Sequence, residues 1–277
     1  MNAVNIVVRD IEGQAEMRAA EELQKEVWGL RDLDVVPLTQ LVAAKAAGGV
    51  VIGAFDRDIL VGFAYGFAGY EEGHVTHHSH MLAVKPGYRS SNVGYLLKLA
   101  QRERVLEQGI ERMTWTFDPL QSVNAHFNFN KLGVVSDRYF VNFYGDDAAS
   151  FLHRNGTDRL WVTWLLKSRH VRERLDGTAQ TFEIGNLRPL VEVEKNNAPL
   201  RRAFDEVSSH KRLVIEIPAN INELEEQRPG ITARWREATR SAFTEAFAAS
   251  YLIDAFQRVD LGDKKVGRYL LNRWELH

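Results

Sequence analysis

Hydrophobic and polar positions alternate at two spacings along the first 170 residues, and together they predict an alternating order of strands and helices. Strands are predicted at 6–8, 50–55, 60–67, 78–84, 112–117, 139–144 and 160–166, and helices at 14–28, 37–48, 92–108 and 124–133. The helix that begins at Asn92 presents an apolar face of Val93, Leu96, Leu97 and Ala100, with Gly109 as its stop. This order predicts an α/β fold.

The last hundred residues carry a weaker pattern. A strand at 213–217, a helix at 232–249 and strands at 251–256 and 268–271 repeat the strand, helix, strand, strand order found earlier. Two interpretations stay open. The segment is either a degenerate second copy without a phosphate loop, or a supporting layer that packs on the first sheet and shapes a substrate pocket, which is the simpler reading. The arginine-rich stretch 168–182 is the expected connection.

Composition excludes several classes of protein. The 277 residues have a formal net charge of −2, so no strong field for nucleic acid or anionic lipid is expected. The chain contains no cysteine, which rules out disulfides, thiolate metal sites and a cysteine nucleophile. No stretch approaches the ~18 apolar residues of a membrane span, and the first 30 residues lack an apolar core typical of a signal peptide. We therefore expect a cytoplasmic protein with neither nucleic acid nor membrane as partner.

The segment Arg89-Ser90-Ser91-Asn92-Val93-Gly94 lies between a predicted strand and a predicted helix. A strand that gives way to a loop of small residues and then to a helix leaves several backbone N–H groups unpaired near the positive end of the helix dipole. Such a site favours a phosphate group. Neither the glycine pattern of a dinucleotide fold nor a P-loop is present. The alternative is an ordinary helix start capped by a serine.

This loop resembles the pyrophosphate loop of the GNAT acetyltransferase superfamily, in which Arg or Gln is followed by two variable residues, Gly, one variable residue and Gly or Ala. Asn92 replaces the usual first glycine, and asparagine tolerates positive φ better than most residues. The segment from Asn124 through Leu132-Gly133 resembles a second GNAT motif, although Ala125 directly follows Asn124 and Val134 replaces an aromatic residue. The stretch from Trp115 also resembles a predicted acyltransferase subgroup linked to N-acylation of amino acids.

The resemblance implies a fold and a cofactor. The fold is a mixed, mostly antiparallel central sheet flanked by helices over residues 1–168, followed by a C-terminal α/β extension, 169–277, which is the possible degenerate half-repeat. The co-substrate is acetyl-CoA or another acyl-CoA, with succinyl-CoA included and no metal. The expected CoA contacts are Leu82, Ala83, Val84, Arg89, Ser90, Ser91, Asn92, Val93, Gly94 and Asn124.

The catalytic groups are less determined. Many members of the superfamily carry a tyrosine proton donor where this chain has Phe129, so Tyr139, Tyr144 or solvent would protonate the leaving thiolate. His80 and His126 are the preferred general bases, since histidine titrates near neutral pH, and Asp118 is the carboxylate alternative. His78 and His80 should share one face of their strand, an arrangement that can also hold a metal ion, although no acidic partner is evident.

Substrate choice is the least determined property. Arg159 begins a predicted strand and could grip a carboxylate or pair with its neighbour Asp158, and Trp115 is an expected contact of the acceptor. The expected activity is acyl transfer to the amine of a small molecule, such as an amino acid. A protein or peptide N-acetyltransferase and a non-catalytic acyl-CoA sensor are the alternatives, and a homodimer is one expected assembly.

Overall fold

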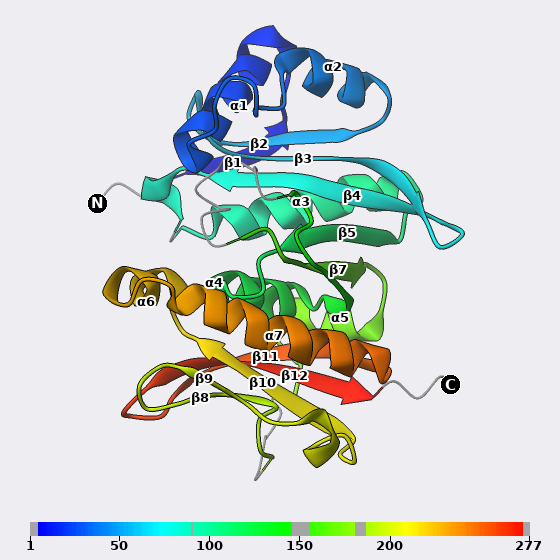
Figure 1. Ribbon diagram of the computed structural model, residues 1–277. Helices are drawn as coiled ribbons and strands as arrows, with labels where there is room; N and C mark the ends of the chain where they lie inside the picture. The colour runs from blue at the N-terminus through cyan, green and yellow to red at the C-terminus, as the bar shows by residue number, and fades with distance from the viewer. Residues whose placement is uncertain (1–4, 90, 146–155, 181–186, 274–277) are drawn as a thin grey trace. The chain divides into compact units, whose positions relative to one another are not determined.

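A computed structural model of the chain describes residues 5–89, 91–145, 156–180 and 187–273 (Figure 1). Contacts divide the chain into two compact units, and the boundary falls inside strand β5, between Trp115 and Thr116. The boundary expected at residue 168, between an acyl-CoA-binding domain and a C-terminal extension, stays a prediction. Each unit is described by itself below.

The first unit contains a five-stranded sheet in the order β1-β2-β3-β4-β5, antiparallel except for the parallel pair β4 and β5. Its elements are β1 (Ile6–Asp10), α1 (Gly13–Trp28), α2 (Leu38–Ala46), β2 (Val50–Asp56), β3 (Ile59–Glu71), β4 (His74–Val84), η1 (Pro86–Tyr88), α3 (Val93–Glu107) and β5 (Arg112–Phe117). The predicted helices and strands of this region are present, with β3 and β4 longer than expected.

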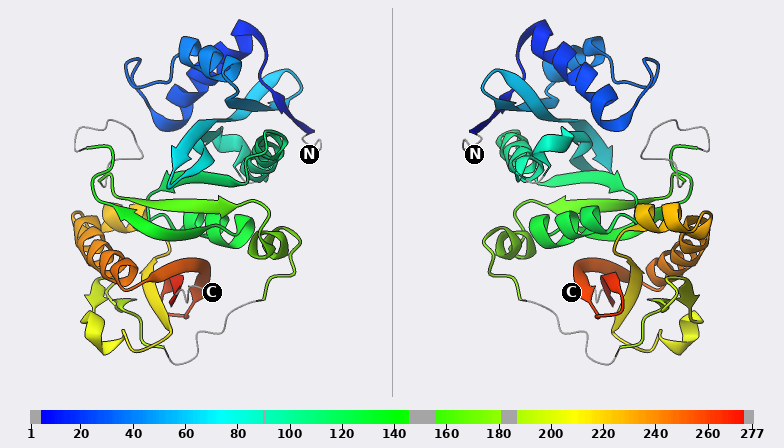
Figure 2. Two further views of the ribbon diagram at one scale, coloured as in Figure 1. Left: turned by 90° about the vertical axis from the view of Figure 1, so that its right-hand side faces the viewer. Right: turned by 90° about the vertical axis from the view of Figure 1, so that its left-hand side faces the viewer.

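Helices cover both faces of the first sheet, with α1 and α2 on one face and α3 on the other (Figures 1 and 2). Strand side chains alternate between faces, so Phe63 and Tyr65 enter the core under α1 and α2. Gly62 and Gly66 face α3, because a Cβ added at Gly62 would meet Val93 and one at Gly66 would meet Gln101. These two glycines allow α3 to lie close to the sheet.

The second unit contains a sheet in the order β7-β6-β11-β12-β10-β8-β9, antiparallel except for the pair β8 and β10. Its elements are α4 (Ser122–Ala125), η2 (His126–Leu132), β6 (Val135–Phe140), β7 (Arg159–Leu165), α5 (Arg169–Leu175), β8 (Val191–Val193), β9 (Pro199–Arg201), η4 (Phe204–Glu206), β10 (Arg212–Pro218), α6 (Ile221–Gln227), α7 (Ile231–Ala248), β11 (Tyr251–Asp260) and β12 (Lys265–Arg273). The order β5, α4, β6, β7 recurs as β10, helices, β11, β12, and each run ends in an antiparallel pair.

The fold class is mixed α/β with mostly antiparallel sheets flanked by helices, as predicted. The expected connection after Ser168 contains α5, because Ser168 caps a helix by accepting a hydrogen bond from the Val171 N–H. Two local expectations were wrong. Strand β6 ends at Phe140, so Tyr144 lies beyond it. Leu96, expected on the apolar face of α3, is 38% exposed. Among the described helices, none is long and apolar enough to cross a membrane.

Candidate functional site

Strand β4 contains a β-bulge at His80. Tyr65 of β3 pairs with Met81, whereas the next residue, Gly66, pairs with Ser79, which leaves His80 as the extra residue. A bulge interrupts the alternation of side chains and leaves backbone groups outside the ladder. As a result, the side chains of His80 and Met81 both lie on the face of the sheet that packs against α1.

Beyond the bulge, β4 runs along a partly unpaired edge. Its parallel pairing with β5 consists of His77 with Met113 and His78 with Thr114, yet β4 continues to Val84. Within the described part of the first unit, the β5 side of residues 79–84 therefore has no strand partner. An unpaired strand edge presents backbone N–H and C=O groups that an extended ligand can join. The predicted contacts Leu82, Ala83 and Val84 lie on this segment.

The N-terminus of α3 adjoins the end of β4. A Cβ added at Gly94 would lie 3.6 Å from Leu82 Cδ2 and 3.9 Å from Val84 Cγ2. Asn92 precedes the helix in the left-handed conformation, with φ 62° and ψ 10°, as its replacement of a glycine implied. The N–H groups of Asn92, Val93 and Gly94 bond no backbone carbonyl of a described residue. They meet the requirement for an anion site at a helix start.

Of the other predicted loop contacts, the structure describes Arg89 and Ser91. The exposed Arg89 places its Nε 3.4 Å from the Val84 carbonyl oxygen, which holds the guanidinium over the end of β4. Ser91 is exposed beside Asn92. Ser90 lies outside the described residues. The predicted anion site therefore has one cation and three available N–H groups among its described members.

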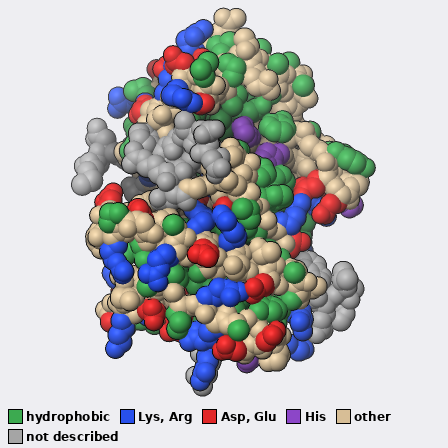
Figure 3. Space-filling model, in the orientation of Figure 1, with side chains coloured by type: hydrophobic (Ala, Val, Ile, Leu, Met, Phe, Trp, Pro, Cys, Tyr) green, Lys and Arg blue, Asp and Glu red, His purple; other side chains and the backbone are tan. Residues whose placement is uncertain are grey.

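Histidine and aromatic rings gather on the β4 face opposite α3. The His80 ring lies 5.9 Å from Tyr65, 6.0 Å from Phe67 and 6.3 Å from His78. Figure 3 shows histidine side chains beside hydrophobic ones on one face of the molecule. Desolvation lowers the pKa of His80 below its usual value and lowers the pKa of His78 to about 4. Both imidazoles are thus neutral at pH 7, the form that accepts a proton.

A polar chain that the sequence reasoning missed is buried under β4 on the α3 side. The Lys98 ammonium donates to Ser79 Oγ at 2.7 Å, Ser79 donates to Gln101 Oε1 at 2.8 Å, and Gln101 Nε2 lies 3.3 Å from His77 Nε2. Lys98 Nζ also lies 3.7 Å from the centre of the Trp115 ring. Burial lowers the pKa of Lys98 to about 7. Lys98 and Gln101 interrupt an otherwise apolar helix face, which is the signal that could have revealed them.

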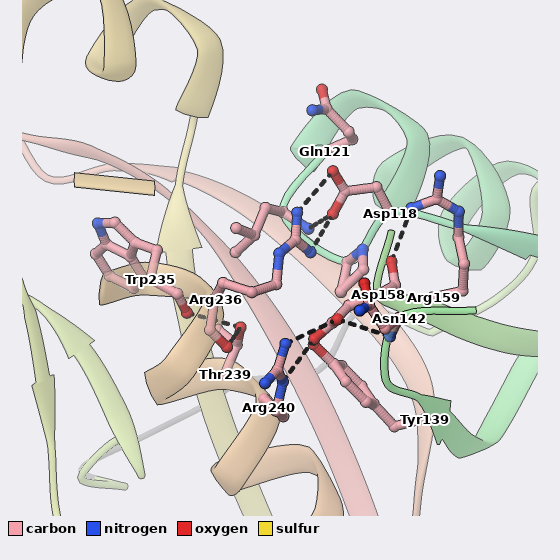
Figure 4. A network of polar contacts seen from close by, with 12 residues as sticks. Asp118, Gln121, Tyr139, Asn142, Asp158, Arg159, Trp235, Arg236, Thr239 and Arg240 are labelled. Carbon is pink, nitrogen blue, oxygen red and sulfur yellow. Dashed lines mark hydrogen bonds and ion pairs between the residues drawn. The ribbon is translucent and has the colours of Figure 1, made fainter. Parts of the chain in front are cut away.

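The second unit brings three predicted residues, Asp118, Tyr139 and Arg159, into one network (Figure 4). Two ion pairs organise it. Asp118 follows β5 and accepts two hydrogen bonds from Arg236 of α7, at 2.6 and 3.1 Å, with both side chains under 10% exposed. Asp158 accepts from Arg240 at 2.9 and 3.0 Å and from the Tyr139 hydroxyl at 2.7 Å. Buried carboxylates held by arginines fix the approach of α7 to its sheet.

Tyr139, Arg159 and Tyr144 complete this network. Desolvation raises the pKa of Tyr139 far above its usual value, and Asp158 adds to the rise. Arg159 starts β7, donates to the Asp158 carbonyl at 2.8 Å and lies 5.3 Å from the centre of the Tyr144 ring. The Tyr144 hydroxyl lies 3.4 Å from Thr116 Oγ1 and is part of a partly exposed side chain. These contacts hold the side chains of Tyr139 and Arg159 in place within the second unit.

The other predicted residues lie outside this network. Trp115 is buried against Lys98 in the first unit. In the second unit, Asn124 is exposed on α4, and the partly buried His126 begins η2, where desolvation lowers its pKa. Phe129 is fully buried between Phe117 and Tyr269. In the described residues, no group of three or more His, Cys, Asp or Glu is arranged to hold a metal ion.

Comparison with solved structures finds matches at low sequence identity and with TM-scores below 0.5. The ribosomal-protein-S18-alanine N-acetyltransferase from Escherichia coli matches with TM-score 0.47 and 11% identity over 59% of this chain and 96% of its own. Aminoglycoside 6'-acetyltransferase type Ii matches with TM-score 0.47 and 19% identity over 60% and 99%. A GNAT family acetyltransferase from Elizabethkingia anophelis with acetyl-CoA bound matches with TM-score 0.46 and 14% identity over 58% and 98%.

The Elizabethkingia protein and another neighbour, a putative acetyltransferase from Desulfovibrio desulfuricans, are named as members of the GNAT family, the superfamily that the loop and the Asn124 motif resemble. The names of the other two neighbours state a protein and a small-molecule substrate. No family model matches the chain, and no curated protein matches it. The functional argument therefore depends on the geometry of this chain.

Proposed function

We propose that the protein is an acyl-CoA-dependent N-acyltransferase that acts on the amine of a small molecule. The observation that carries this proposal is the juxtaposition in the first unit of the unpaired edge of β4 with the start of α3. An extended pantetheine arm can hydrogen-bond to the strand edge while its pyrophosphate takes the N–H groups of Asn92, Val93 and Gly94. Arg89 adds a charge-assisted contact.

The bulge at His80 provides two groups for the acyl transfer, a backbone N–H and the His80 imidazole. Attack of a neutral amine on the thioester carbonyl forms the C–N bond and breaks the C–S bond, with CoA leaving as a thiolate. A backbone N–H freed by the bulge stabilises the negative charge on the carbonyl oxygen in the transition state. Neutral His80 accepts the ammonium proton, directly or through one water. Solvent protonates the thiolate, since an ordinary thiol has a pKa near ~8.5.

Direct transfer without a covalent enzyme intermediate fits the side chains present, because the chain has no cysteine. The acceptor is proposed to be an amino acid or a similar amine, with acetyl-CoA or succinyl-CoA as donor. Protein or peptide acetylation is the second candidate, since the structural neighbours include a plant enzyme, Naa50, bound to a peptide-containing bisubstrate analogue. A non-catalytic sensor would bind acyl-CoA without converting it to free CoA thiol.

Turnover of thioester tests the proposal. Purified protein is mixed with acetyl-CoA or succinyl-CoA and a panel of amino acids and amines, and the released CoA thiol is measured against protein-free controls. We expect amine-dependent thiol release with one donor preferred. Tight binding of acetyl-CoA without release from any amine would favour the sensor, and absence of binding would contradict the proposed site.

Replacing His80 with glutamine is expected to lower kcat by about 100-fold, within the range for loss of a general base. The KM for acyl-CoA should change little, because the phosphate contacts are elsewhere on the unit. Since the pKa of His80 is lowered by desolvation, the acid limb of the parent's kcat profile should lie below pH 6.5 and disappear in the variant. His74→Gln, at the exposed start of β4, is the matched control. Equal kcat values and identical pH profiles for all three proteins would exclude His80 as the base.

A further inference from the structure

Helices α1 and α2 cover only part of their face of the first sheet. Along β3, Phe63 and Tyr65 are 0% and 2% exposed, whereas Phe67, the next large side chain on the same face, is 38% exposed. Phe63 and Tyr65 belong to the core cluster beneath the two helices, and Phe67 lies outside it. The cover provided by α1 and α2 therefore ends between Tyr65 and Phe67.

Phe67 forms a floor of rings with the proposed base and a second histidine. It pairs directly with His78 across β3 and β4, with 5.7 Å between the ring centres, and its ring centre lies 6.0 Å from that of His80. Both histidines are partly exposed. His78 Nδ1 lies 3.2 Å from Thr114 Oγ1, a contact that orients the imidazole. The ring floor, Phe67, His78 and His80, is thus an accessible surface beside the proposed general base.

The ring floor carries no charge at pH 7. Desolvation lowers the pKa of His78 to about 4 and lowers the pKa of His80 as well, and phenylalanine has no ionisable group. Neutral aromatic rings pack favourably against other rings, edge to face or offset. A single exposed phenylalanine needs no explanation, but three accessible rings around a proposed base form a surface suited to an aromatic ligand.

Gly69 leaves room at the outer end of the ring floor. It is the next residue after Phe67 on the same face of β3, and it pairs with Thr76 of β4. A Cβ added at Gly69 would have one neighbour within 4 Å, Thr76 Oγ1 at 3.5 Å. The absence of a side chain at position 69 therefore leaves space beside Phe67 for a group as broad as a ring.

The separation of His80 and Phe67 limits how far such a ring can be from the reacting amine. The amine must approach the His80 imidazole to about 3 Å to form a hydrogen bond. Packed aromatic rings have centres roughly 4.5–7 Å apart. With 6.0 Å between the centres of His80 and Phe67, a ring joined to the amine through two carbons can pack on Phe67 while the amine meets His80.

We propose that the acceptor carries an aromatic ring two carbons from its amine, and that Phe67 is the residue that determines this specificity. The ring packs on Phe67 and His78, and its outer edge occupies the space beside Gly69. This proposal rests on the proposed function, because it takes His80 as the group that receives the amine proton. The 2-phenylethylamine unit has this chemistry, both as the free amine and within phenylalanine.

Release of CoA thiol from acetyl-CoA and, separately, from succinyl-CoA tests the proposal. The acceptors are 2-phenylethylamine and its alkyl counterpart butylamine, and L-phenylalanine and its counterpart L-alanine. We expect at least one ring-bearing acceptor to have a kcat/KM about 10-fold or more above that of its counterpart. Both ring-bearing acceptors support the proposal, and the better of the two shows whether the acceptor also carries a carboxylate.

Two variants with opposite changes in volume test the role of the ring floor. Phe67→Ala removes the packing surface and Gly69→Leu fills the space beside it. Each should lower kcat/KM for the preferred ring-bearing acceptor by about 10-fold or more and leave that for its counterpart within about 3-fold. General damage to the fold would lower both values alike. Tyr70→Ala is the matched control, since Tyr70 is 76% exposed and has the opposite orientation along β3.

Equal kcat/KM values for ring-bearing acceptors and their counterparts in the parent would overturn the proposal, as would a preference unchanged in both Phe67→Ala and Gly69→Leu. Absence of thiol release from every amine would instead contradict the proposed function. Calorimetric titration of 2-phenylethylamine into the protein, with and without CoA, then decides the present proposal. Saturable binding that Phe67→Ala weakens by about 10-fold would support the aromatic site, and absence of saturable binding would overturn it.

Discussion

Replacing Gly94 with glutamate is expected to reduce acetyl-CoA affinity by more than 100-fold. Gly94 supplies one of the N–H groups proposed to hold the pyrophosphate, and its Cα lies beside Leu82 and Val84 at the end of β4. A carboxylate there would occupy the phosphate position and repel the phosphate charge. The helix itself should tolerate the change, because an acidic residue in the first turn interacts favourably with the helix dipole. Calorimetry with acetyl-CoA measures the effect.

Gly94→Ala is the matched control. Its Cβ would be in ordinary van der Waals contact with Leu82 and Val84, at 3.6 and 3.9 Å, so the variant should fold and bind acetyl-CoA within a few-fold of the parent. Parent affinity should also fall with rising salt, as expected for a site dominated by phosphate charge. A folded Gly94→Glu protein that binds acetyl-CoA as tightly as the parent would show that the loop is not the phosphate site.

Replacing Lys98 with methionine is expected to raise the free energy of unfolding by several kcal/mol at pH 6 to 7. Lys98 is 3% exposed, and its pKa falls from 10.5 to about 7 in the folded protein because burial disfavours the charged ammonium. Each unit of difference between folded and unfolded pKa corresponds to about 1.4 kcal/mol. Methionine retains the length of the side chain and leaves Ser79 bonded to Gln101.

The effect should depend on pH in a defined direction. Between pH 7 and 10.5 the unfolded state holds the Lys98 proton and the folded state does not, so parent stability rises with pH across this window. The advantage of Lys98→Met should therefore be largest below pH 7 and shrink toward pH 10. Urea unfolding at pH 6, 8 and 10 measures it, with the exposed Lys195→Met as control. A less stable variant, or a stability difference that does not change with pH, would contradict the lowered pKa of Lys98 in the folded protein.

Sequence patterning predicted the elements around the phosphate loop well, because each has a strong local signal. The strand before the loop, the positive φ of Asn92 and the helix that follows all come from residues close in the chain. The closing glycine of the second motif is likewise found, with Gly133 in the left-handed conformation. Short strands such as β8 and β9 were missed, because three residues carry no measurable periodicity.

The candidate catalytic residues were harder to predict, because their roles depend on partners distant in sequence. From the sequence, Tyr139 and Asp118 look like free polar groups near strand ends. In the structure Tyr139 donates a hydrogen bond to Asp158, and Asp118 accepts one from Arg236. Arg236 comes 118 positions after Asp118, a separation over which no local pattern operates. The bulge at His80 was also unpredicted, since it depends on the pairing of β4 with β3 rather than on either strand alone.

That bulge has a consequence for how the gene can change. Substitutions along β4 alter one side chain at a time, whereas insertion or deletion of a single residue shifts the pleat phase of all that follows. Removal of His80 would restore regular pairing between β3 and β4 while taking away the irregularity that places His80 and Met81 on one face. A one-residue insertion or deletion between His80 and Val84 is therefore expected to turn every side chain that follows it in β4 to the opposite face of the sheet.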